Sequence, residues 1–510
     1  MPDTAEGVAA TEEATVDLAR LLSEALGKEA VPSDCRGVEV HDLCDDSRKI
    51  TPGAVFVAMA GTKVRGAAFA NEAAARGAAA IVTDADVDLA AGPVIVKVPD
   101  SRKALAALAA TYFGLDRIQA RGELRITGIT GTNGKSTTAF MLRSILKSAG
   151  LQSALFGTIE YDLIGRTIPA ALTTPDAVTL TRHIVEAHDA GARHAVMEVS
   201  SHSLCQRRTD GIRFSTAIFT NLTQDHLDYH RTQEDYLLAK RRLFDDLGPE
   251  ASAVVNADDP SGERIVANCR ARIIRFGIDG AAEVRARIIE EGRQGSCFSL
   301  EHERDRFEIR TAMVGRHNAV NALGAAAAAL ALGVPPTAIQ EGISSLKNVP
   351  GRLQLVDTGD LGFDVYIDYA HTDDALRNVL RAVRPLTRGK LWCVFGCGGD
   401  RDQTKRPLMA RAVAEAADAF IITSDNPRTE DPLAIIADIE RGLSPQDRER
   451  SLTEPDRTCA IAYAISHLAP GDILVIAGKG HEKYQILGTE KMHFDDVEVA
   501  EGAIRRRARR

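Results

Sequence analysis

Short apolar runs alternate with longer segments of helical periodicity along most of the chain. In the middle part, runs of four to six mostly apolar residues are separated by stretches in which apolar residues recur at helical spacing. Such runs predict parallel strands that are covered on both faces by the intervening helices. We expect these strands at residues 124–129, 154–157, 194–198, 216–220, 253–256 and 273–276.

The two ends of the chain follow a related plan. The first part predicts strands at 37–40, 54–58, 80–83 and 94–97, and an alanine-rich helix at 69–76. Charged residues alternate with apolar ones at 282–312, which is typical of antiparallel strands. After Pro350-Gly351-Arg352, further strands are expected at 364–368, 390–395, 419–423 and 473–477.

These patterns predict an α/β protein with three domains. A smaller N-terminal α/β domain would span residues 1–115, a central domain with a parallel sheet 116–348, and a Rossmann-like C-terminal domain 349–510. Ligands of such sheets bind beyond the carboxyl ends of the strands. The polar motifs of this chain fall at such ends.

Composition and charge narrow the class of protein. Hydrophobic residues make up 45% of the 510 residues and charged residues 26%, which is ordinary for a globular protein. The net charge of −9 argues against a nucleic-acid partner. The tail from Arg505 to Arg510 is locally basic, so contact with RNA or lipid is one interpretation; we expect a solvated, frayed end instead.

Neither a membrane span nor an exported protein is expected. The apolar run 322–334 covers 13 residues, fewer than the roughly 18 that cross a bilayer, and predicts a buried helix that ends at Gly333. The acidic N-terminus lacks the pattern of a signal peptide. Eight cysteines without Cys-x-x-Cys pairs predict reduced thiols and a cytoplasmic protein.

A glycine-rich turn follows the first strand of the central part. Residues 128–137 read Gly-Ile-Thr-Gly-Thr-Asn-Gly-Lys-Ser-Thr and precede a helical pattern. Loop N–H groups would point at the phosphates of a nucleoside triphosphate, Lys135 would add positive charge, and Ser136 could hold Mg²⁺. The general P-loop pattern needs a glycine where this chain has Ile129. The turn still predicts a P-loop, ATPase-like central domain.

Polar residues at two later strand ends suggest metal chemistry. Glu198 could complete a Mg²⁺ shell. His226, Asp228 and His230 allow a zinc site, but we prefer one histidine at a second Mg²⁺ because no thiolates accompany them. The alternative for each of these residues is that it is simply a polar residue of a solvent-exposed loop. Lys240, from its helical surroundings alone, is predicted to be a solvated lysine.

The last part of the chain offers a site for an amino acid. Arg401 and Arg428 follow strands and could bind carboxylates through paired N–H groups, and Glu482 could meet an ammonium. These charges would suit a zwitterion. Structural ion pairs among the same residues are the alternative.

Taken together, these segments resemble the Mur ligase family. The matching motifs are 131–136 (Gly-Thr-Asn-Gly-Lys-Ser), 198–202 (Glu-Val-Ser-Ser-His), 225–230 (Asp-His-Leu-Asp-Tyr-His), His317-Asn318 with Asn321, Pro350-Gly351-Arg352 and 368–372 (Asp-Tyr-Ala-His-Thr). The resemblance implies a cytoplasmic, three-domain ATP-dependent ligase that forms amide bonds in peptidoglycan synthesis, and so serves cell wall biogenesis, cell shape and cell division. It also implies an acyl-phosphate intermediate.

Within the family, the chain is most similar to ligases that add the third residue of the peptide. Residues 425–428 (Asp-Asn-Pro-Arg) resemble the signature for meso-2,6-diaminopimelate, with L-lysine as the alternative substrate. The implied substrates are this amino acid, UDP-N-acetylmuramoyl-L-alanyl-D-glutamate and ATP, with Mg²⁺ as cofactor. We expect a monomer.

The resemblance also implies the site residues. The nucleotide would contact Gly131, Thr132, Asn133, Gly134, Lys135, Ser136, Thr137, Asn318, Asn321, Arg352 and His371. The UDP-substrate would contact Asp45, Ser47, Thr62, Lys63, Val64, Thr173, Thr174, Ser200, Gln206 and Arg208. Diaminopimelate would contact Arg401, Asp425, Asn426, Pro427, Arg428, Gly478 and Glu482. Catalysis would rest on Lys135, Glu198, His226 and Lys240, and metal would bind Ser136, Glu198, His226 and a carbamylated Lys240.

Two departures and two rival functions complete the prediction. Arg65-Gly66 stands where the family often has Asp-Gly, and Asp373 where it often has Pro. A folylpolyglutamate synthase is the nearest rival enzyme, but it lacks a uridine-binding first domain and the 425–428 segment. A P-loop switch protein is the rival from another class, in which an arginine-rich cleft would have no purpose.

Overall fold

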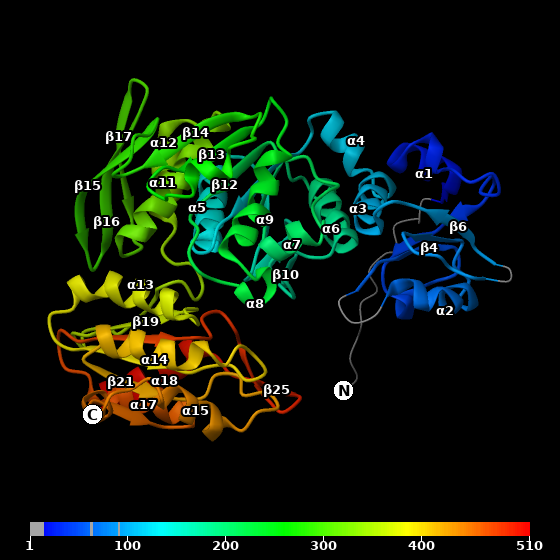
Figure 1. Cartoon of the computed structure of the whole chain (residues 1–510). Coiled ribbons are helices and arrows are strands. Elements are labelled where there is room, and N and C mark those ends of the chain that lie inside the picture. The colour runs from blue at the N-terminus through cyan, green and yellow to red at the C-terminus, as the bar shows by residue number, and fades with distance from the viewer. Residues whose placement is uncertain (1–14, 62–64, 90–91, 510) are drawn as a thin grey trace, which may run out of the picture. The chain divides into compact units, whose positions relative to one another are not determined.

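The chain forms two compact units. The computed structural model describes residues 15–61, 65–89 and 92–509. Residues 1–127 and 152–215 cluster as a first unit, and residues 128–151 and 216–510 as a second. Figure 1 colours the chain from blue at the N-terminus to red at the C-terminus.

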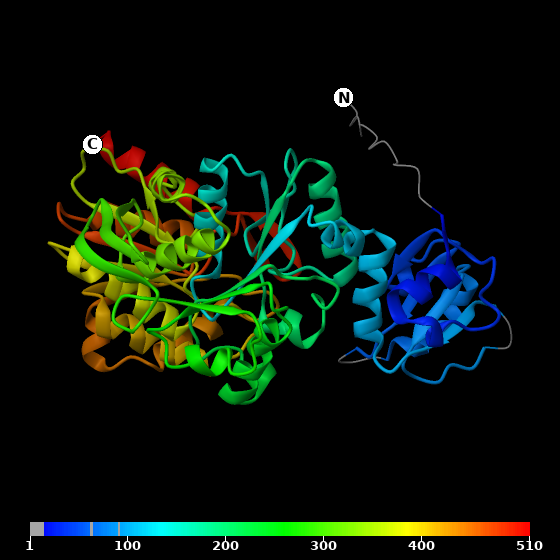
Figure 2. The same ribbon diagram turned by 90° about the horizontal axis from the view of Figure 1, so that it is seen from above.

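A four-stranded parallel sheet organises the N-terminal part. Its order is β3 (Asp42–Cys44), β4 (Ala54–Ala58), β5 (Ala80–Thr83) and β6 (Val94–Lys97). Helices α1 (Leu18–Leu26) and α3 (Ser101–Tyr112) cover one face, and α2 (Ala70–Ala75) covers the other. Figure 2 looks onto the α1 side of this sheet. Side chains of one strand alternate between the two cores, as the period of a strand requires.

One strand prediction in this part, that for residues 37–40, is confirmed only for its last two residues. Residues 37–40 contribute only β2 (Glu39–Val40), which pairs antiparallel with β1 (Val16–Asp17) outside the four-stranded sheet. Gly37 has a left-handed φ of 75°, and the N–H of Val38 donates to the carbonyl of Cys35, so the chain turns where a strand was expected. The edge of the sheet is β3 instead.

The rest of the first unit carries parallel strands with a hairpin at the edge. β8 (Ser153–Phe156) and β11 (His194–Glu198) are parallel, and β9 (Glu160–Asp162) and β10 (Thr167–Pro169) extend β8 antiparallel. Helix α6 (Ala177–Asp189) directly follows Asp176, whose side chain caps its N-terminus. β7 (Arg125–Thr130) starts in this unit and ends in the second.

The central part of the second unit continues with parallel strands. β12 (Thr216–Phe219), β13 (Ser252–Asn256) and β14 (Arg272–Gly277) are parallel, and β15 (Val284–Gly292), β16 (Gly295–His302) and β17 (Asp305–Thr311) form antiparallel pairs. The antiparallel prediction for 282–312 is therefore confirmed. Helices α5 (Lys135–Ser148), α11 (Arg316–Ala331) and α12 (Pro336–Ser345) pack together, and Ala325 to Ala329 are fully buried, as predicted for an alanine-rich helix that ends before Gly333.

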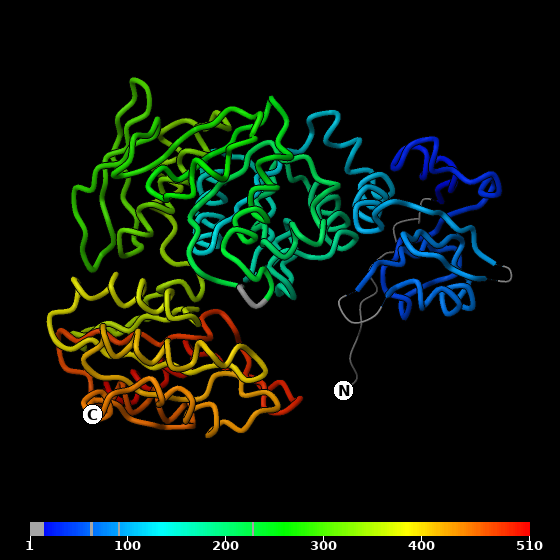
Figure 3. The backbone as a smooth tube through the Cα atoms, viewed as in Figure 1, coloured from blue at the N-terminus to red at the C-terminus, as the bar shows by residue number. Residues whose placement is uncertain are grey.

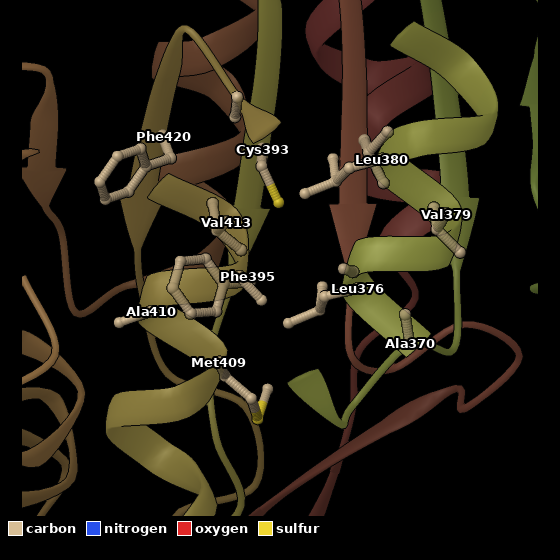
Figure 4. Close-up of a cluster of buried hydrophobic side chains, with 14 of the residues drawn as sticks. Ala370, Leu376, Val379, Leu380, Cys393, Phe395, Met409, Ala410, Val413 and Phe420 are labelled. Atoms are coloured by element: carbon tan, nitrogen blue, oxygen red, sulfur yellow. The ribbon is translucent and has the colours of Figure 1, made fainter. Parts of the chain in front are cut away.

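A second, mostly parallel sheet forms the C-terminal part. Its order is β18 (Gln354–Val356), β19 (Asp364–Asp368), β23 (Ile473–Ala477), β20 (Leu391–Phe395), β21 (Ala419–Ile422) and β22 (Ser451–Thr453). Helices α13 (Asp373–Val383) and α14 (Lys405–Ala416) cover one face, where Leu376 and Met409 approach Phe395 (Figure 4). Helices α17 (Arg457–His467) and α18 (Asp496–Ala508) cover the other. The predicted α/β class with parallel sheets is confirmed.

The C-terminal end differs from the prediction of a frayed tail. α18 remains helical to Ala508, and the guanidinium of Arg507 donates to the carbonyls of Ile465 and Leu468 at the end of α17. Arg507 thereby satisfies carbonyls that a helix end leaves without partners. The frayed-end interpretation is therefore wrong for residues 505–508. Among the described residues, no helix has the length and apolar character needed to cross a membrane.

Candidate active site

The glycine-rich loop joins β7 to α5 in a conformation that glycine makes possible. Gly131 and Gly134 have φ of 152° and 85°, and a side chain at either position would overlap Thr220 or Asn321. Ser136 and Thr137 are buried in the first turn of α5. The loop therefore opens onto the N-terminus of a helix, where unpaired N–H groups favour anions.

Neighbouring strands hold the loop in shape. The N–H of Thr132 donates to the backbone carbonyl of Asn221 at 2.9 Å, and that of Asn133 donates to the Asn221 side chain at 2.9 Å. The Thr220 hydroxyl donates to the carbonyl of Asn133 at 2.7 Å. These contacts come from the residues that follow β12, so this strand end holds the loop in its shape.

Charged side chains gather on the loop. Lys135 Nζ donates to the carbonyls of Gly131 at 3.0 Å and Thr132 at 2.8 Å. Arg352 Nη2 donates to Ser136 Oγ at 3.0 Å, although the two residues are 216 positions apart. The Arg352 guanidinium also lies 5.0 Å from the centre of the Tyr369 ring. The structure thus brings Lys135, Ser136 and Arg352 together.

Two buried carboxamides lie beside the loop on α11. Asn321 Nδ2 donates to Asn318 Oδ1 at 3.2 Å, and Asn318 Nδ2 donates to the Val314 carbonyl at 2.9 Å. Asn321 is the residue that a side chain at Gly134 would strike, which puts this carboxamide against the loop. Neutral amides can both donate to and accept from a base such as adenine.

The C-terminal part contributes a histidine and an unpredicted aspartate. His371 Nδ1 lies 2.8 Å from the Tyr369 carbonyl, and burial, with the nearby Lys405 charge, lowers the pKa of His371. Asp374 Oδ2 accepts from Thr223 Oγ1 at 2.9 Å and from Asn133 Nδ2 at 3.3 Å. Asp374 therefore contacts the loop directly, and the sequence motifs did not single it out.

Lys240 lies in the core rather than on the surface of α9 (Gln233–Asp245). The residue is 1% exposed, and its Nζ donates to the Gly131 carbonyl at 2.8 Å and lies 4.4 Å from the centre of the Tyr236 ring. Burial holds the pKa of Lys240 well below its ordinary value, and the Lys135 charge lowers it further. The surface interpretation from the sequence is wrong.

His226 lies near the same tyrosine. Its ring centre is 6.2 Å from that of Tyr236, its φ is 53°, and its backbone N–H donates to the Asp225 carboxylate at 2.8 Å. Where the structure describes side chains, no group of three or more His, Cys, Asp or Glu is arranged to hold a metal ion. The Asp228 side chain, part of the zinc alternative, lies outside the described side chains.

In the first unit, Glu198 is the last residue of β11, and its carboxylate is fully buried. It accepts from the Thr158 N–H at 2.8 Å through Oε1 and from the Thr158 hydroxyl at 3.0 Å through Oε2. Its backbone carbonyl accepts from Thr174 Oγ1 at 2.9 Å. These bonds fix both the side chain and the strand end.

Five of the residues assigned to the UDP-substrate lie in a hydrogen-bonded group with Glu198. Thr173 Oγ1 lies 3.1 Å from Thr158 Oγ1, and Thr174 Oγ1 accepts from the Ser200 N–H at 3.1 Å. Arg208 donates to the Thr174 carbonyl at 2.7 Å and to Gln206 Oε1 at 2.7 and 3.1 Å. The structure brings these five predicted residues into one polar cluster.

A pocket of about 680 Å³ lies in the N-terminal part. Asp45 and Ser47 line it together with Arg48, Phe56, Phe69 and Arg102 among others. Burial and the Asp176 carboxylate raise the pKa of Asp45. A smaller cavity of about 370 Å³ is lined by Arg65, the departure noted in the sequence. Thr62, Lys63 and Val64 lie outside the described residues.

The residues assigned to diaminopimelate form a charged cluster at the ends of β21 and β23. Asn426 Nδ2 donates to Glu482 Oε2 at 2.9 Å, and Asp425 is buried beside Gly478, where a side chain would meet its carboxylate. Burial raises the pKa of Glu482, and the Asp425 charge adds to the shift. Lys479, which the sequence motifs did not assign to the site, is fully buried at its centre.

Arg428 is held by the loop at Gly399 and by a neighbouring hairpin. Its φ is 54°, and its Nη1 donates to the Gly399 carbonyl at 2.7 Å. β24 (Tyr484–Leu487) pairs with β25 (Glu490–His493), and the carbonyl of Ile486 in β24 accepts from the Arg428 N–H. In Figure 3 this hairpin is the red loop at the edge of the C-terminal part. Pro427 precedes Arg428 in the same turn. Arg401 is exposed on the loop after β20.

Three family models match the chain. They are the Mur ligase family catalytic domain at residues 39–113, the Mur ligase middle domain at 129–329 and the Mur ligase glutamate ligase domain at 351–480. Together they cover three consecutive parts of the chain.

Known proteins match almost the full length. A protein named UDP-N-acetylmuramoyl-L-alanyl-D-glutamate--2,6-diaminopimelate ligase from Solibacter usitatus is 44% identical over 489 residues, which is 95% of this chain and 97% of the relative. A solved structure of a ligase with the same name is 32% identical, with a TM-score of 0.69 over 97% of this chain and 99% of the other. MurF ligase from Thermotoga maritima in complex with ADP has a TM-score of 0.60 at 18% identity over 92% and 98% of the two chains, and shares the fold alone.

Proposed function

The chain belongs to the Mur ligase family, and we propose from that premise that it joins meso-2,6-diaminopimelate to UDP-N-acetylmuramoyl-L-alanyl-D-glutamate at the expense of ATP. The predicted ligase activity and three-domain α/β fold are confirmed by the relatives. The observation that supports the amino-acid specificity is the turn from Asp425 to Arg428. In this turn the Asp425 carboxylate acts on Glu482 and the Asn426 carboxamide donates to it, while the Arg428 guanidinium donates to the Gly399 carbonyl.

The reaction proceeds in two balanced steps. An oxygen of the D-glutamyl carboxylate attacks the γ-phosphorus of ATP; a new P–O bond forms, the bond to ADP breaks, and an acyl phosphate results. The amine of the amino acid then attacks the acyl carbon, loses a proton, and expels phosphate as the C–N bond forms. Both steps depend on positioning and charge stabilisation, without a covalent enzyme intermediate.

The phosphate loop supplies most of that stabilisation. The N–H groups at the start of α5, Lys135 and Arg352 would bind the phosphates and the phosphoryl group in transfer. Asn318 and Asn321 would bind the adenine, and His371 would lie at the nucleotide. The cluster around Glu198 would hold the muramoyl end of the substrate, and the pocket at Asp45 and Ser47 its uridine end.

The donor set suits Mg²⁺. Ser136, Glu198 and a carbamylated Lys240 would offer the oxygen ligands that magnesium favours, and His226 would add a ring nitrogen. Lys240 fits carbamylation because CO₂ adds to a neutral amine, and burial favours that neutral form. When bound, Mg²⁺ neutralises charge on the transferred phosphoryl group.

The proposal also includes the location, the oligomeric state and the biological role of the enzyme. The protein would act as a cytoplasmic monomer in cell wall biogenesis, and thereby in cell shape and division. Its domains would have the predicted bounds 1–115, 116–348 and 349–510. L-lysine at the amino-acid site remains the alternative, and a folylpolyglutamate synthase-like ligase the remote one.

Phosphate release from ATP tests the proposed function. We expect release only when the UDP-muramoyl dipeptide and diaminopimelate are both present, because the amine must consume the acyl phosphate for turnover. A competition with L-lysine in the same assay should yield the diaminopimelate product. Release that ignores both substrates would contradict the ligase, and preferential use of L-lysine would contradict the specificity.

Arg428 is expected to set the preference for diaminopimelate. Arg428→Ala removes the guanidinium for the distal carboxylate. The kcat/KM for diaminopimelate should therefore fall roughly 30-fold, a loss of about 2 kcal/mol in binding free energy. This is the low end for a buried charge pair, because Arg428 is only partly buried. Arg441→Ala, which removes an arginine that is 76% exposed and paired with Asp438, is the matched control. Unchanged diaminopimelate kinetics in Arg428→Ala would show that this guanidinium does not select the substrate.

A further inference from the structure

Lys479 lies at the centre of the amino-acid cluster. Its side chain is 0% exposed, and its Nζ lies 3.9 Å from Asp425 Oδ1 and 3.6 Å from Glu482 Oε2. The same Nζ donates to Asn426 Oδ1 at 3.0 Å. Burying an ammonium is costly unless partners compensate it. The two carboxylates and the carboxamide supply that compensation, so the lysine and the cluster depend on each other.

The lysine fixes the orientation of the Asn426 carboxamide. Oδ1 of Asn426 accepts from Lys479 Nζ and from the Ile486 N–H, both at 3.0 Å, and lysine is a donor only. The Nδ2 end must therefore point the other way, where it donates to Glu482 Oε2 at 2.9 Å. Lys479 thus orients Glu482 in two ways, by its charge and through Asn426.

Glu482 is the member of the cluster that is most open to a ligand. Its side chain is 18% exposed, against 10% for Asp425 and 0% for Lys479. Two carboxylates face one ammonium, so the cluster carries an excess negative charge. Such an excess suits the ammonium group of an amino acid.

The groups that pack around Lys479 add no net charge to the cluster. Beneath it, Arg457 and Asp496 neutralise each other through contacts of 2.7 Å. The rings of Tyr484 and Phe494 lie 5.8 and 6.0 Å from Lys479 Nζ. On the other side of Glu482, Tyr369 has its pKa raised to about 12, chiefly by burial, and so stays neutral.

We propose that Lys479 is a positioning residue for the incoming amino acid, which orients Asn426 and Glu482 so that the Glu482 carboxylate receives the substrate's ammonium group. This inference rests on the proposed function. It has a consequence for pH: burial and Asp425 raise the pKa of Glu482, and Lys479 opposes that shift. Without the lysine, Glu482 becomes protonated at a higher pH and loses its attraction for the ammonium.

Lys479→Met tests the proposal, because methionine keeps much of the volume and removes the charge and the donor. KM for diaminopimelate should rise roughly ten- to hundred-fold, the usual effect of losing a charge-assisted hydrogen bond, while KM for ATP and for the UDP-substrate stays the same. The acid-side rise of the diaminopimelate KM should begin at a higher pH than in the wild type. Lys483→Met, at a lysine that is 72% exposed, is the matched control and should change neither value.

A second variant separates charge from hydrogen bonding. Lys479→Gln can still donate to Asn426, so it should show the pH displacement with a smaller rise in KM. Equal changes in all three KM values, or an unmoved pH profile in a folded variant, would overturn the proposal in favour of a purely structural lysine. If neither variant folds, Asn426→Ser breaks the same bridge, and an unchanged diaminopimelate KM there overturns it too. Wild-type turnover of diaminopimelate is measured first, so failure of the proposed function is recognised separately.

Discussion

Lys240→Met is expected to lower kcat by roughly 10²–10³-fold, the scale of removing one group that stabilises charge in a transition state. Methionine fills the buried space beside Gly131 and Tyr236 but cannot form a carbamate. The metal-binding anion that the proposal assigns to this position would be lost, while the phosphate loop would keep its shape. Steady-state kinetics with all three substrates saturating measure the effect.

The CO₂ dependence of the wild type distinguishes a carbamate from an ordinary lysine. Carbamylation requires the neutral amine, and burial lowers the pKa of Lys240, so the neutral form is available at lower pH than in an exposed lysine. Enzyme freed of CO₂ should lose activity, and bicarbonate should restore it. In Lys240→Met, bicarbonate should have no effect.

A lysine on α5 provides the matched control. Lys147 lies in the exposed last turn of that helix, and Lys147→Met should keep both full activity and its response to bicarbonate. Full activity of Lys240→Met would remove the carbamate from the proposal. Activity of the wild type that ignores CO₂ would do the same, even if the variant is slow.

The sequence predicted the buried strands far better than the exposed ones. The predicted bounds of β4, β5, β6, β11, β19 and β23 agree with the structure, because each is a short, mostly apolar run. The hairpins β9–β10 and β24–β25 were not predicted. Their strands have three or four residues and no alternating pattern, and their pairing partners stabilise them more than their own sequences do.

In the candidate site, too, the sequence predicted local motifs but not contacts between distant residues. Glycines and the Lys135-Ser136 pair are local signals, and the predicted loop lies where they placed it. The buried Lys240 donates to a carbonyl 109 positions away, and the buried Lys479 donates to Asn426, 53 positions away. Composition and periodicity carry no trace of such distant partners. Only the family resemblance reversed the surface interpretation of Lys240, and nothing in the motifs singled out Lys479.

Arg457→Met is expected to destabilise the C-terminal part by about 3–5 kcal/mol, because it leaves Asp496 as a buried, unpaired charge. Arg457 Nε and Nη2 each lie 2.7 Å from a carboxylate oxygen of Asp496, and both side chains are 0% exposed. Whole domains are usually stable by only about 5–15 kcal/mol, so the loss would leave this part marginal.

A single tryptophan allows the stability of the C-terminal part to be measured separately. Trp392, the only tryptophan, lies in β20 and packs against the core formed with α17 and α18, where Arg457 and Asp496 lie. Its fluorescence during urea unfolding therefore follows this part, which matters because a multidomain chain need not unfold in one step. Arg505→Met breaks an exposed pair with Glu501 on the same α18 and should cost about 1 kcal/mol or less.

The double variant Arg457→Met, Asp496→Leu separates the cost of an unpaired charge from the worth of the pair. Apolar replacements of a buried ion pair are often neutral, so the double variant should recover most of the stability. Arg457 Nη2 also donates to the Ala477 carbonyl at 2.9 Å, directly before Gly478 and Lys479. If stability returns while KM for diaminopimelate stays raised, the arginine also holds the amino-acid loop. If Arg457→Met is as stable as the wild type, Asp496 has found protons or water, and the pair does not stabilise the fold.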